Sequence, residues 1–224
     1  MDLSDVRIVF GPDELARIGR FRYQVYIEEQ GKNAHAVDHA ARSLIEPIDR
    51  AAATTIFYLE REGELVATLR AEFLDEGNCD HADAFAAFDF MPPSQMISFT
   101  RLMVAPRFRR SDATPKLLFL GFALALLKDR CLGLLTCKPE LVPVFEMYGC
   151  LQYADAFVHA ESGPQVPMAI LGELDYLRTR AAPLADWLAP HRPQSLYTDR
   201  FLAPITAYRI ARSRPVRAAT RLTA

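Results

Sequence analysis

The sequence is short of cysteine and of long apolar segments. Its four cysteines are Cys79, Cys131, Cys137 and Cys150, and no two of them form a C-x-x-C pair. Residues 1–5 are acidic, unlike the basic start of a secretory leader. The longest apolar run covers 11 residues, from 117 to 127, whereas a membrane-spanning helix needs about 20. We therefore expect a cytoplasmic protein with a buried apolar helix and no structural disulfide.

The sequence also lacks an excess of charge of either sign. The formal net charge is −2 and the isoelectric point is about 6.2, which argues against a dedicated nucleic-acid-binding protein. Charge is unevenly spread, however. Residues 200–224 hold six arginines and no acid, which leaves 20 cations against 28 anions in the first 199 residues.

The basic carboxyl-terminal segment has an apolar side. At helical spacing, Leu202, Ile205, Tyr208 and Ile210 lie near one face, with several arginines opposite. This pattern favours contact with an anionic surface, either the inner face of a membrane or an acidic carrier protein. A solvated terminus is the alternative.

Hydrophobic spacing predicts alternating helices and strands over the first 180 residues. Residues 13–31 have a helical pattern, and residues 54–60 and 65–73 have the pattern of a β-hairpin. The further predicted elements are a short helix at 82–90, a strand at 96–104, a helix from 114, a strand at 133–137, a helix at 139–148 and strands at 151–159 and 166–174. Prolines after Tyr176 break the chain into short helical pieces, so we expect one domain over 1–180 and a basic helical extension over 181–224.

A basic turn joins the third strand to the apolar helix. Arg107, Arg109, Arg110 and Lys116 gather near the expected start of that helix. A helix amino-terminus presents unpaired N–H groups and the positive end of the helix dipole, so it attracts phosphate. The turn predicts a site for a phosphorylated ligand, with a solvated cationic loop as the alternative.

The order of the elements, with Val-Ala-Pro-Arg-Phe-Arg-Arg at 104–110 and Phe-Glu-Met-Tyr-Gly-Cys at 145–150, resembles the GNAT acyltransferase superfamily over residues 10–180. The resemblance implies a mixed α/β, strongly bent sheet, here followed by the helical extension. It also implies an acyl-thioester donor, whose pantetheine arm lies where one strand splays from its neighbour and whose phosphate sits on the turn. The residues placed there are Leu102, Met103, Val104, Arg109, Arg110 and Ser111.

Two features depart from that family's pattern. Glycines usually line the turn in a Q/R-x-x-G-x-G/A motif, whereas residues 109–113 contain none. The single phosphate of an acyl carrier protein needs less space than coenzyme A, so we expect the carrier protein as donor and coenzyme A as the second choice. The family's general-acid tyrosine falls at Phe145, and we expect Tyr148 to face another side of its helix.

Four short motifs narrow the resemblance. They are Arg-Tyr-Gln-Val-Tyr at 22–26, Glu-Pro-Ile-Asp at 46–49, Ala-Thr-Leu-Arg at 67–70 and Ser-Phe-Thr-Arg at 98–101. In this order they resemble the group that contains the acyl-homoserine-lactone synthases and the long-chain N-acyl amino acid synthases. Lactone synthases carry glutamate where this chain has Ser98, which favours the amino acid synthases.

Acyl transfer to an amine sets the roles that the candidate residues must fill. The amine must lose a proton, and the thioester oxygen needs a hydrogen-bond donor as it becomes anionic. We count Glu72, Ser98 and Arg101 as candidate catalytic residues, with Glu72 or Glu46 as proton acceptor and backbone N–H groups near 103–104 as donors. Arg70 and Arg101 can clamp an acceptor carboxylate, with Glu46 and Asp49 beside them, or can form structural ion pairs with those acids.

Other clusters predict less. His35, Asp38 and His39 have helical metal-site spacing but no third ligand, and Cys79-Asp80-His81 is too compact to surround an ion. We expect no metal and no covalently bound cofactor. Near His159, Cys137 and Cys150 lie in apolar segments, which favours buried thiols over a nucleophile.

The sequence therefore predicts an N-acyltransferase that moves a fatty acyl group from an acyl carrier protein to an amino acid or related amine. An autoinducer-forming lactone synthase is the first alternative, recognisable by its need for S-adenosylmethionine. An inactive GNAT domain that binds a carrier protein or a membrane is the second.

Overall fold

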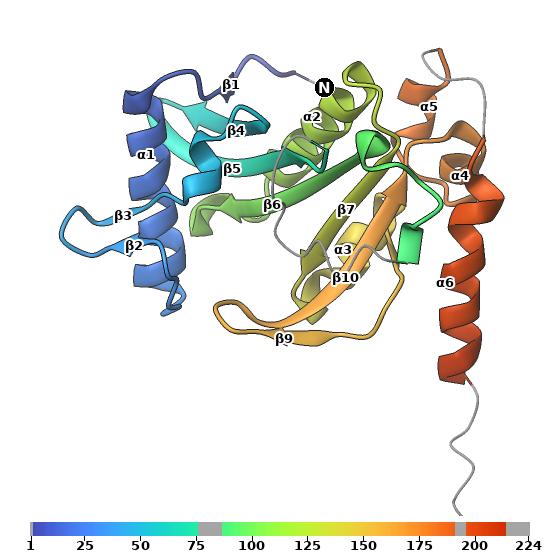
Figure 1. Ribbon diagram of the computed structural model, residues 1–224. Helices are drawn as coiled ribbons and strands as arrows, with labels where there is room; N and C mark the ends of the chain where they lie inside the picture. Colours follow the sequence, from blue (N-terminus) through green and yellow to red (C-terminus); the bar gives the residue numbers. More distant parts are fainter. Residues whose placement is uncertain (1, 76–86, 191–195, 214–224) are drawn as a thin grey trace, which may run out of the picture.

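One mixed sheet runs through the molecule in the order β1-β4-β5-β6-β7-β10-β8, with β9 paired to β10 (Figure 1). The structure, a computed structural model, describes residues 2–75, 87–190 and 196–213. The strands are β1 (Val6–Ile8), β4 (Thr54–Arg61), β5 (Glu64–Phe73), β6 (Met96–Val104), β7 (Leu132–Cys137), β8 (Leu151–Gln152), β9 (Phe157–His159) and β10 (Gly163–Leu171). All neighbours pair antiparallel except β6 and β7, which are parallel.

Helices cover both faces of this sheet. Figure 1 shows α1 and the small β2–β3 sheet beside β4–β6, at the left of the view. Helices α4–α6 lie at the right, near β7 and β10. The helices are α1 (Pro12–Tyr23), a π-helix (Gln24–Glu29), α2 (Ala113–Leu127), α3 (Val142–Met147), α4 (Leu174–Thr179), α5 (Ala185–Leu188) and α6 (Thr198–Ser213), and the small sheet pairs β2 (Val37–Asp38) with β3 (Ser43–Leu44).

Strand alternation sends successive side chains of β4 to these two layers. Ile56 and Tyr58 pack against Ile18 of α1, whereas Phe57 and Leu59 join Leu117 of α2 in a second core cluster. Because alternate residues on a strand face opposite sides of a sheet, both faces of this sheet are buried. This accounts for the unbroken apolar run at residues 56–59 of β4.

The sheet opens between β6 and β7. Their pairing ends at Phe99 opposite Leu135, although β6 continues to Val104 and β7 stays paired with β10 as far as Cys137. On its other edge, β6 carries a β-bulge, because Arg101 and Leu102 both lie opposite the one residue between Thr68 and Arg70. The strands thus separate where β6 bends.

Most of the predicted elements are present. The strand predicted at 96–104 is β6. The predicted hairpin is β4–β5, in which each strand continues one residue further into the turn than predicted. The strand predicted at 151–159 is instead broken into β8 and β9. The segment 32–50, for which no helix or strand was predicted, contains β2 and β3. The helix predicted at 82–90 falls mostly on residues 76–86, which lie outside the described residues.

The carboxyl-terminal segment forms a longer helix than predicted, and its apolar side faces the protein. Phe201 and Ile205 of α6 are buried in the same core cluster as residues of β7 and β10. Tyr208 accepts a 2.9 Å hydrogen bond from Gln152. Ile210, predicted on the apolar face, is half exposed.

This burial corrects the prediction that the apolar face of the segment meets a membrane or carrier protein, since the domain itself covers that face. Arg214, Arg217 and Arg221 lie outside the described residues. No described helix combines the length and the apolar character needed to cross a bilayer. The boundary near residue 180 stays a prediction.

Replacing Phe201 by alanine tests how firmly α6 belongs to the core. The Phe201 ring stacks on Phe88 with centroids 5.6 Å apart and meets Tyr176 edge-on at 4.9 Å. Phe201→Ala should lower the free energy of unfolding by about 3–5 kcal/mol, and urea denaturation measures it. Ile210→Ala on the same helix should change it by about 1 kcal/mol or less. Equal small effects would show that α6 contributes little to the core.

Candidate active site

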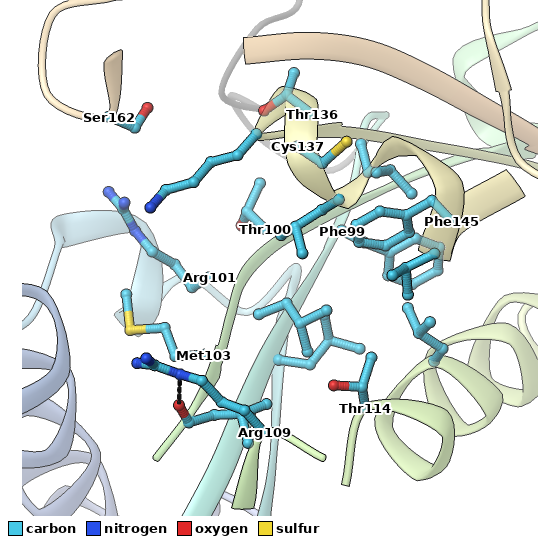
Figure 2. A pocket seen from close by; sticks show the side chains of 18 of the residues that line it. Phe99, Thr100, Arg101, Met103, Arg109, Thr114, Thr136, Cys137, Phe145 and Ser162 are labelled. Atoms are coloured by element: carbon cyan, nitrogen blue, oxygen red, sulfur yellow. Dashed lines mark hydrogen bonds between the residues drawn. The ribbon is translucent and has the colours of Figure 1, made fainter. Parts of the chain in front are cut away.

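A cleft of about 660 Å³ occupies the opening between β6 and β7. Residues 100–104 of β6 form one wall, and Thr136 and Cys137 at the end of β7 form the other (Figure 2). The amino-terminal end of α2 and helix α3 close the apolar side, where Thr114 and Phe145 lie. The cleft therefore exists because β6 leaves β7 after Phe99.

The basic turn contributes two arginines to this cleft. Arg109 and Arg110 both line it. Arg109 donates from Nε to the Val104 carbonyl at 3.2 Å (Figure 2). Its Nη2 donates to Glu29 at 2.7 Å. Ser111 also lines the cleft, but its hydroxyl donates to the Phe108 carbonyl at 2.7 Å and accepts from the Ala113 amide at 3.2 Å. Its hydroxyl therefore serves the start of α2.

The other two cations of the turn point elsewhere, which corrects the predicted four-cation cluster. Lys116 is buried, with its Nζ 2.8 Å from Asp5 and 3.2 Å from Asp112. Arg107 pairs with Glu64 in the β4–β5 hairpin. Both cations find carboxylates on the side of the turn that faces away from the cleft.

A network of buried ion pairs lies behind the β6 wall, with Arg70 at its centre. Arg70 has no exposed surface. Its Nη1 donates to Glu46 at 2.6 Å and to Asp49 at 3.2 Å, and its Nε donates to Glu72 at 2.5 Å. Asp49 also accepts a 2.7 Å bond from Arg22 on α1, and both of these side chains are fully buried.

Arg101 joins this network to the cleft. The residue has a positive φ of 52° within the β6 bulge, which aims its side chain toward Glu46. Nε donates to one Glu46 oxygen at 2.7 Å, and Nη2 donates to the other. The guanidinium also lies 5.5 Å from the Tyr26 ring centroid. Arg101 is thus held on two sides, and it forms part of the cleft wall.

Glu46 is a strong anion in this setting. Its burial alone would favour the protonated acid, but the guanidinium groups of Arg101 and Arg70 outweigh that effect and lower the pKa of Glu46 to about 2. Glu46 is therefore a weak base near neutral pH. Its two carboxylate oxygens accept from Nε and Nη2 of Arg101, and so hold the guanidinium in one orientation.

The structure separates the predicted site residues into two groups. Those that line the cleft are Arg101, Leu102, Met103, Val104, Arg109, Arg110 and Ser111. Those in the sheet interior or behind the wall are Glu46, Asp49, Arg70, Glu72 and Ser98. The second group does not line the cleft: its charges are turned toward one another, and Ser98 is buried. Direct contact of these residues with substrate stays a prediction.

Several cleft residues were not among the predicted site residues. Tyr26 and Lys32 come from the π-helix and the turn after it, Lys138 follows β7, and Ser162 lies in the β9–β10 turn. Tyr26 stands in the Arg-Tyr-Gln-Val-Tyr motif, which was the available signal for it. The two lysines carry no motif.

Tyr148 corrects a further expectation. It lines the cleft together with Phe145, although it was expected on another side of the helix. Residues three apart share a helix face, so the spacing itself allows both side chains to reach the cleft. Burial raises the pKa of Tyr148, and no partner for its hydroxyl is found among the residues that the structure describes.

Among the described residues, the competing constellations do not form reactive centres. Burial raises the pKa of Cys137 to about 12, and Cys150 is also a buried thiol with a raised pKa. His39 bonds to the Tyr23 hydroxyl at 3.1 Å, and its segment is a β-hairpin rather than a helix. Over residues 2–75, 87–190 and 196–213, no three histidine, cysteine or acidic side chains converge on a metal position. Cys79, Asp80 and His81 lie outside the described residues.

Comparison with known proteins fixes the family. The sequence model of the N-acyl amino acid synthase FeeM matches residues 17–171, well over half of the chain. The chain belongs to the FeeM family. It is accordingly an N-acyltransferase, which confirms the predicted enzyme class and the resemblance to this group. No curated protein matches it by sequence.

Solved structures confirm the predicted GNAT-like fold of this FeeM-family enzyme. FeeM from uncultured soil microbes matches with a TM-score of 0.62 and 16% identity, covering 81% of this chain and 96% of its own. The CoA-dependent acyl-homoserine lactone synthase BjaI matches with 0.63 and 11%, covering 92% and 98%. Escherichia coli ElaA matches with 0.52 and 15%, covering 74% and 97%.

Glu46→Gln should reduce the pH dependence of stability. The folded protein lowers the pKa of Glu46 from its ordinary 4.5 to about 2, so the ionised carboxylate stabilises the fold above the higher value and loses this effect as pH falls through the lower one. The gap in unfolding free energy between wild type and variant should shrink by about 2 kcal/mol from about pH 6 to pH 3. Urea denaturation over this range measures it, with Glu62→Gln on the exposed hairpin turn as control. A constant gap would contradict the ion-pair assignment.

Proposed function

We propose that this FeeM-family N-acyltransferase moves a fatty acyl chain from an acyl carrier protein to the amine of an amino acid. One observation carries the proposal: the cleft passes between two separated strands, with cationic side chains from different elements along it and an apolar wall in the middle. Such a passage suits two substrates together. The donor places its phosphate at one end and its acyl chain in the middle, and the ionic acceptor lies at the other end.

The basic turn supports the carrier protein as donor. The turn has no glycine between Arg107 and Ala113, so side chains occupy the space that a pyrophosphate would use. Arg110 lines the cleft and has no acidic partner within the described chain. An arginine suits the single phosphate of phosphopantetheine through charge-assisted hydrogen bonds.

The wall beside the β6 opening supports thioester chemistry. The Ala105 amide donates to Val66 at 2.9 Å, so the alternation of a strand turns the Val104 amide the other way, toward the cleft. This amide is our candidate donor to the thioester oxygen as it becomes anionic.

The proton balance assigns a role to Tyr148. The amine nitrogen bonds to the acyl carbon, the C–S bond breaks, and the amine's proton leaves to water in the open cleft. The departing thiolate takes a proton from the Tyr148 hydroxyl, which its raised pKa keeps protonated at neutral pH. The Tyr148 phenolate then regains a proton from water, which closes the balance with the proton that the amine released. Arg101 and Glu46 hold the acceptor side in place, as positioning residues.

Tyr148 also bears on the inactive-domain alternative. Phe145 at the position of the family's general-acid tyrosine would favour a domain that only binds, but Tyr148 lines the cleft. The lactone synthase alternative rests on fold similarity at 11–16% identity. Contact of the remaining basic surface of α6 with a membrane stays a prediction.

Turnover with defined donors tests the proposal. Dodecanoyl-carrier protein and dodecanoyl-CoA should each be incubated with single amino acids, and N-acyl products quantified by mass spectrometry. We expect product without S-adenosylmethionine, and a kcat/KM about tenfold or more higher for the carrier protein, because the turn suits one phosphate. Equal rates with both donors would contradict the donor assignment, and a strict need for S-adenosylmethionine would identify a lactone synthase.

Charge removal at the turn tests the donor end separately. Arg109→Gln with Arg110→Gln should lower donor kcat/KM about 10- to 100-fold, since charge-assisted hydrogen bonds contribute about 1.5–3 kcal/mol each. Arg107→Gln is the matched control, because Arg107 pairs with Glu64 outside the cleft, and it should retain the wild-type rate within about twofold. An unchanged donor KM in the double variant would show that the turn does not bind the donor.

A further inference from the structure

Two lysines in the cleft lack the acidic partners that the neighbouring arginines have. Arg101 is bound by Glu46 and Arg109 by Glu29. Lys32 and Lys138 line the same cleft, and no carboxylate lies within ion-pair distance of either ammonium in the described part of the chain. The protein thus brings two cations to the cleft without neutralising them by direct contact.

The fold fixes the position of Lys32. The π-helix ends at Glu29, Gly31 takes a left-handed φ of 62°, and the Lys32 amide donates to the Tyr26 carbonyl at 3.1 Å. The ammonium lies 4.2 Å from the centroid of the Tyr26 ring, a cation–π contact that holds the side chain beside Arg101. Turns of π-helix often occur at functional sites.

Lys138 approaches from the opposite wall. It follows Cys137 at the end of β7, where β7 has left β6, and it precedes the 3-10 helix Pro139–Leu141. Partial burial of Lys32, together with the positive charges of Lys138 and Arg101, lowers the pKa of Lys32 to about 8, while Glu140 acts in the other direction. The cations repel one another, and an anion between them would relieve that repulsion.

We propose that Lys32 and Lys138 form a subsite that binds the carboxylate of the amino acid acceptor. This inference rests on the proposed function and deepens it. It moves the carboxylate contact away from the predicted pair, Arg70 and Arg101. Arg70 has no exposed surface, and the Nε and Nη2 atoms of Arg101 already donate to Glu46.

The position of the subsite suits the reaction. Figure 2 shows Arg109 and Ser162 at opposite sides of the cleft, with Arg101 between them. The side chain of Tyr26 interacts with Ser162, and Lys32 lies over that ring, which places Lys32 away from Arg109 and the donor phosphate. In an α-amino acid the carboxylate is two bonds from the amine, so a carboxylate held there leaves the nitrogen facing the β6 wall.

A product-like ligand and its amide test the subsite directly. We choose N-dodecanoylglycine, which carries the acyl chain and the carboxylate common to all such products, and N-dodecanoylglycinamide, which lacks the charge. Calorimetry at pH 7 should give wild type at least tenfold tighter binding of the acid than of the amide. Lys32→Met should reduce this preference to threefold or less, Lys138→Met should reduce it in the same direction, and Lys32→Arg should retain it.

Lys128→Met is the matched control, because Lys128 is exposed at the end of α2 and does not line the cleft. It should bind both ligands as wild type does. The acid preference of wild type should also fall between pH 7 and 9.5, as Lys32 loses its proton beside Lys138, Arg101, Glu140 and Tyr26, whereas Lys32→Arg should hold it constant.

The outcomes separate the two proposals. Equal binding of acid and amide by wild type, or an acid preference that survives Lys32→Met, would overturn the subsite and leave the acyl-transfer proposal standing. Failure of wild type to bind either ligand would overturn both. An amide that binds normally to Lys32→Met would show that the variant is folded and that only the contact with the carboxylate is lost.

Discussion

The buried guanidinium of Arg70 connects the parts of the protein that meet at the acceptor side of the cleft. Through Asp49 it is joined to Arg22 on α1, and through Glu46 it is joined to Arg101 on the bulged strand β6. Charges in such a network depend on one another, because removing one partner leaves another buried and uncompensated, at a cost of about 3–5 kcal/mol. The network therefore fixes one arrangement of α1, β5 and β6.

Phe99 explains why the sheet opens where it does. It is the last residue of β6 that pairs with β7, and its ring lies against two glycines. A Cβ atom on Gly121 of α2 would come within 2.8 Å of that ring, and one on Gly133 of β7 within 3.0 Å. Both glycines leave room for the Phe99 ring, which packs between β7 and α2. The bulge at residues 101–102 then turns the rest of β6 away from β7. The open wall leaves the end of β6 without a partner strand on the cleft side.

Charge pairing determines which cations remain available to ligands. Arg101 is held by Glu46, while Lys116 and Arg107 are occupied outside the cleft. Arg110 at one end, and Lys32 with Lys138 at the other, keep their charge for partners from solution. The transfer to an amino acid that we propose brings two anions, a donor phosphate and an acceptor carboxylate. Among the described residues, the cleft has a cation without an ion-pair partner at each end.

The sequence by itself determined the local elements and the family. Hydrophobic period and proline positions were enough to place β6 and α2, and four short motifs pointed to the group to which the chain belongs. Only the tertiary structure decided which charged residues face the cleft, because their partners lie far away along the chain. Lys116 meets Asp5, 111 residues away, and α6 turns Phe201 into the core of β7 and β10. Lys32 and Lys138 carry no motif. They stand out only in the folded protein, where no carboxylate of the described residues comes within ion-pair distance of either ammonium.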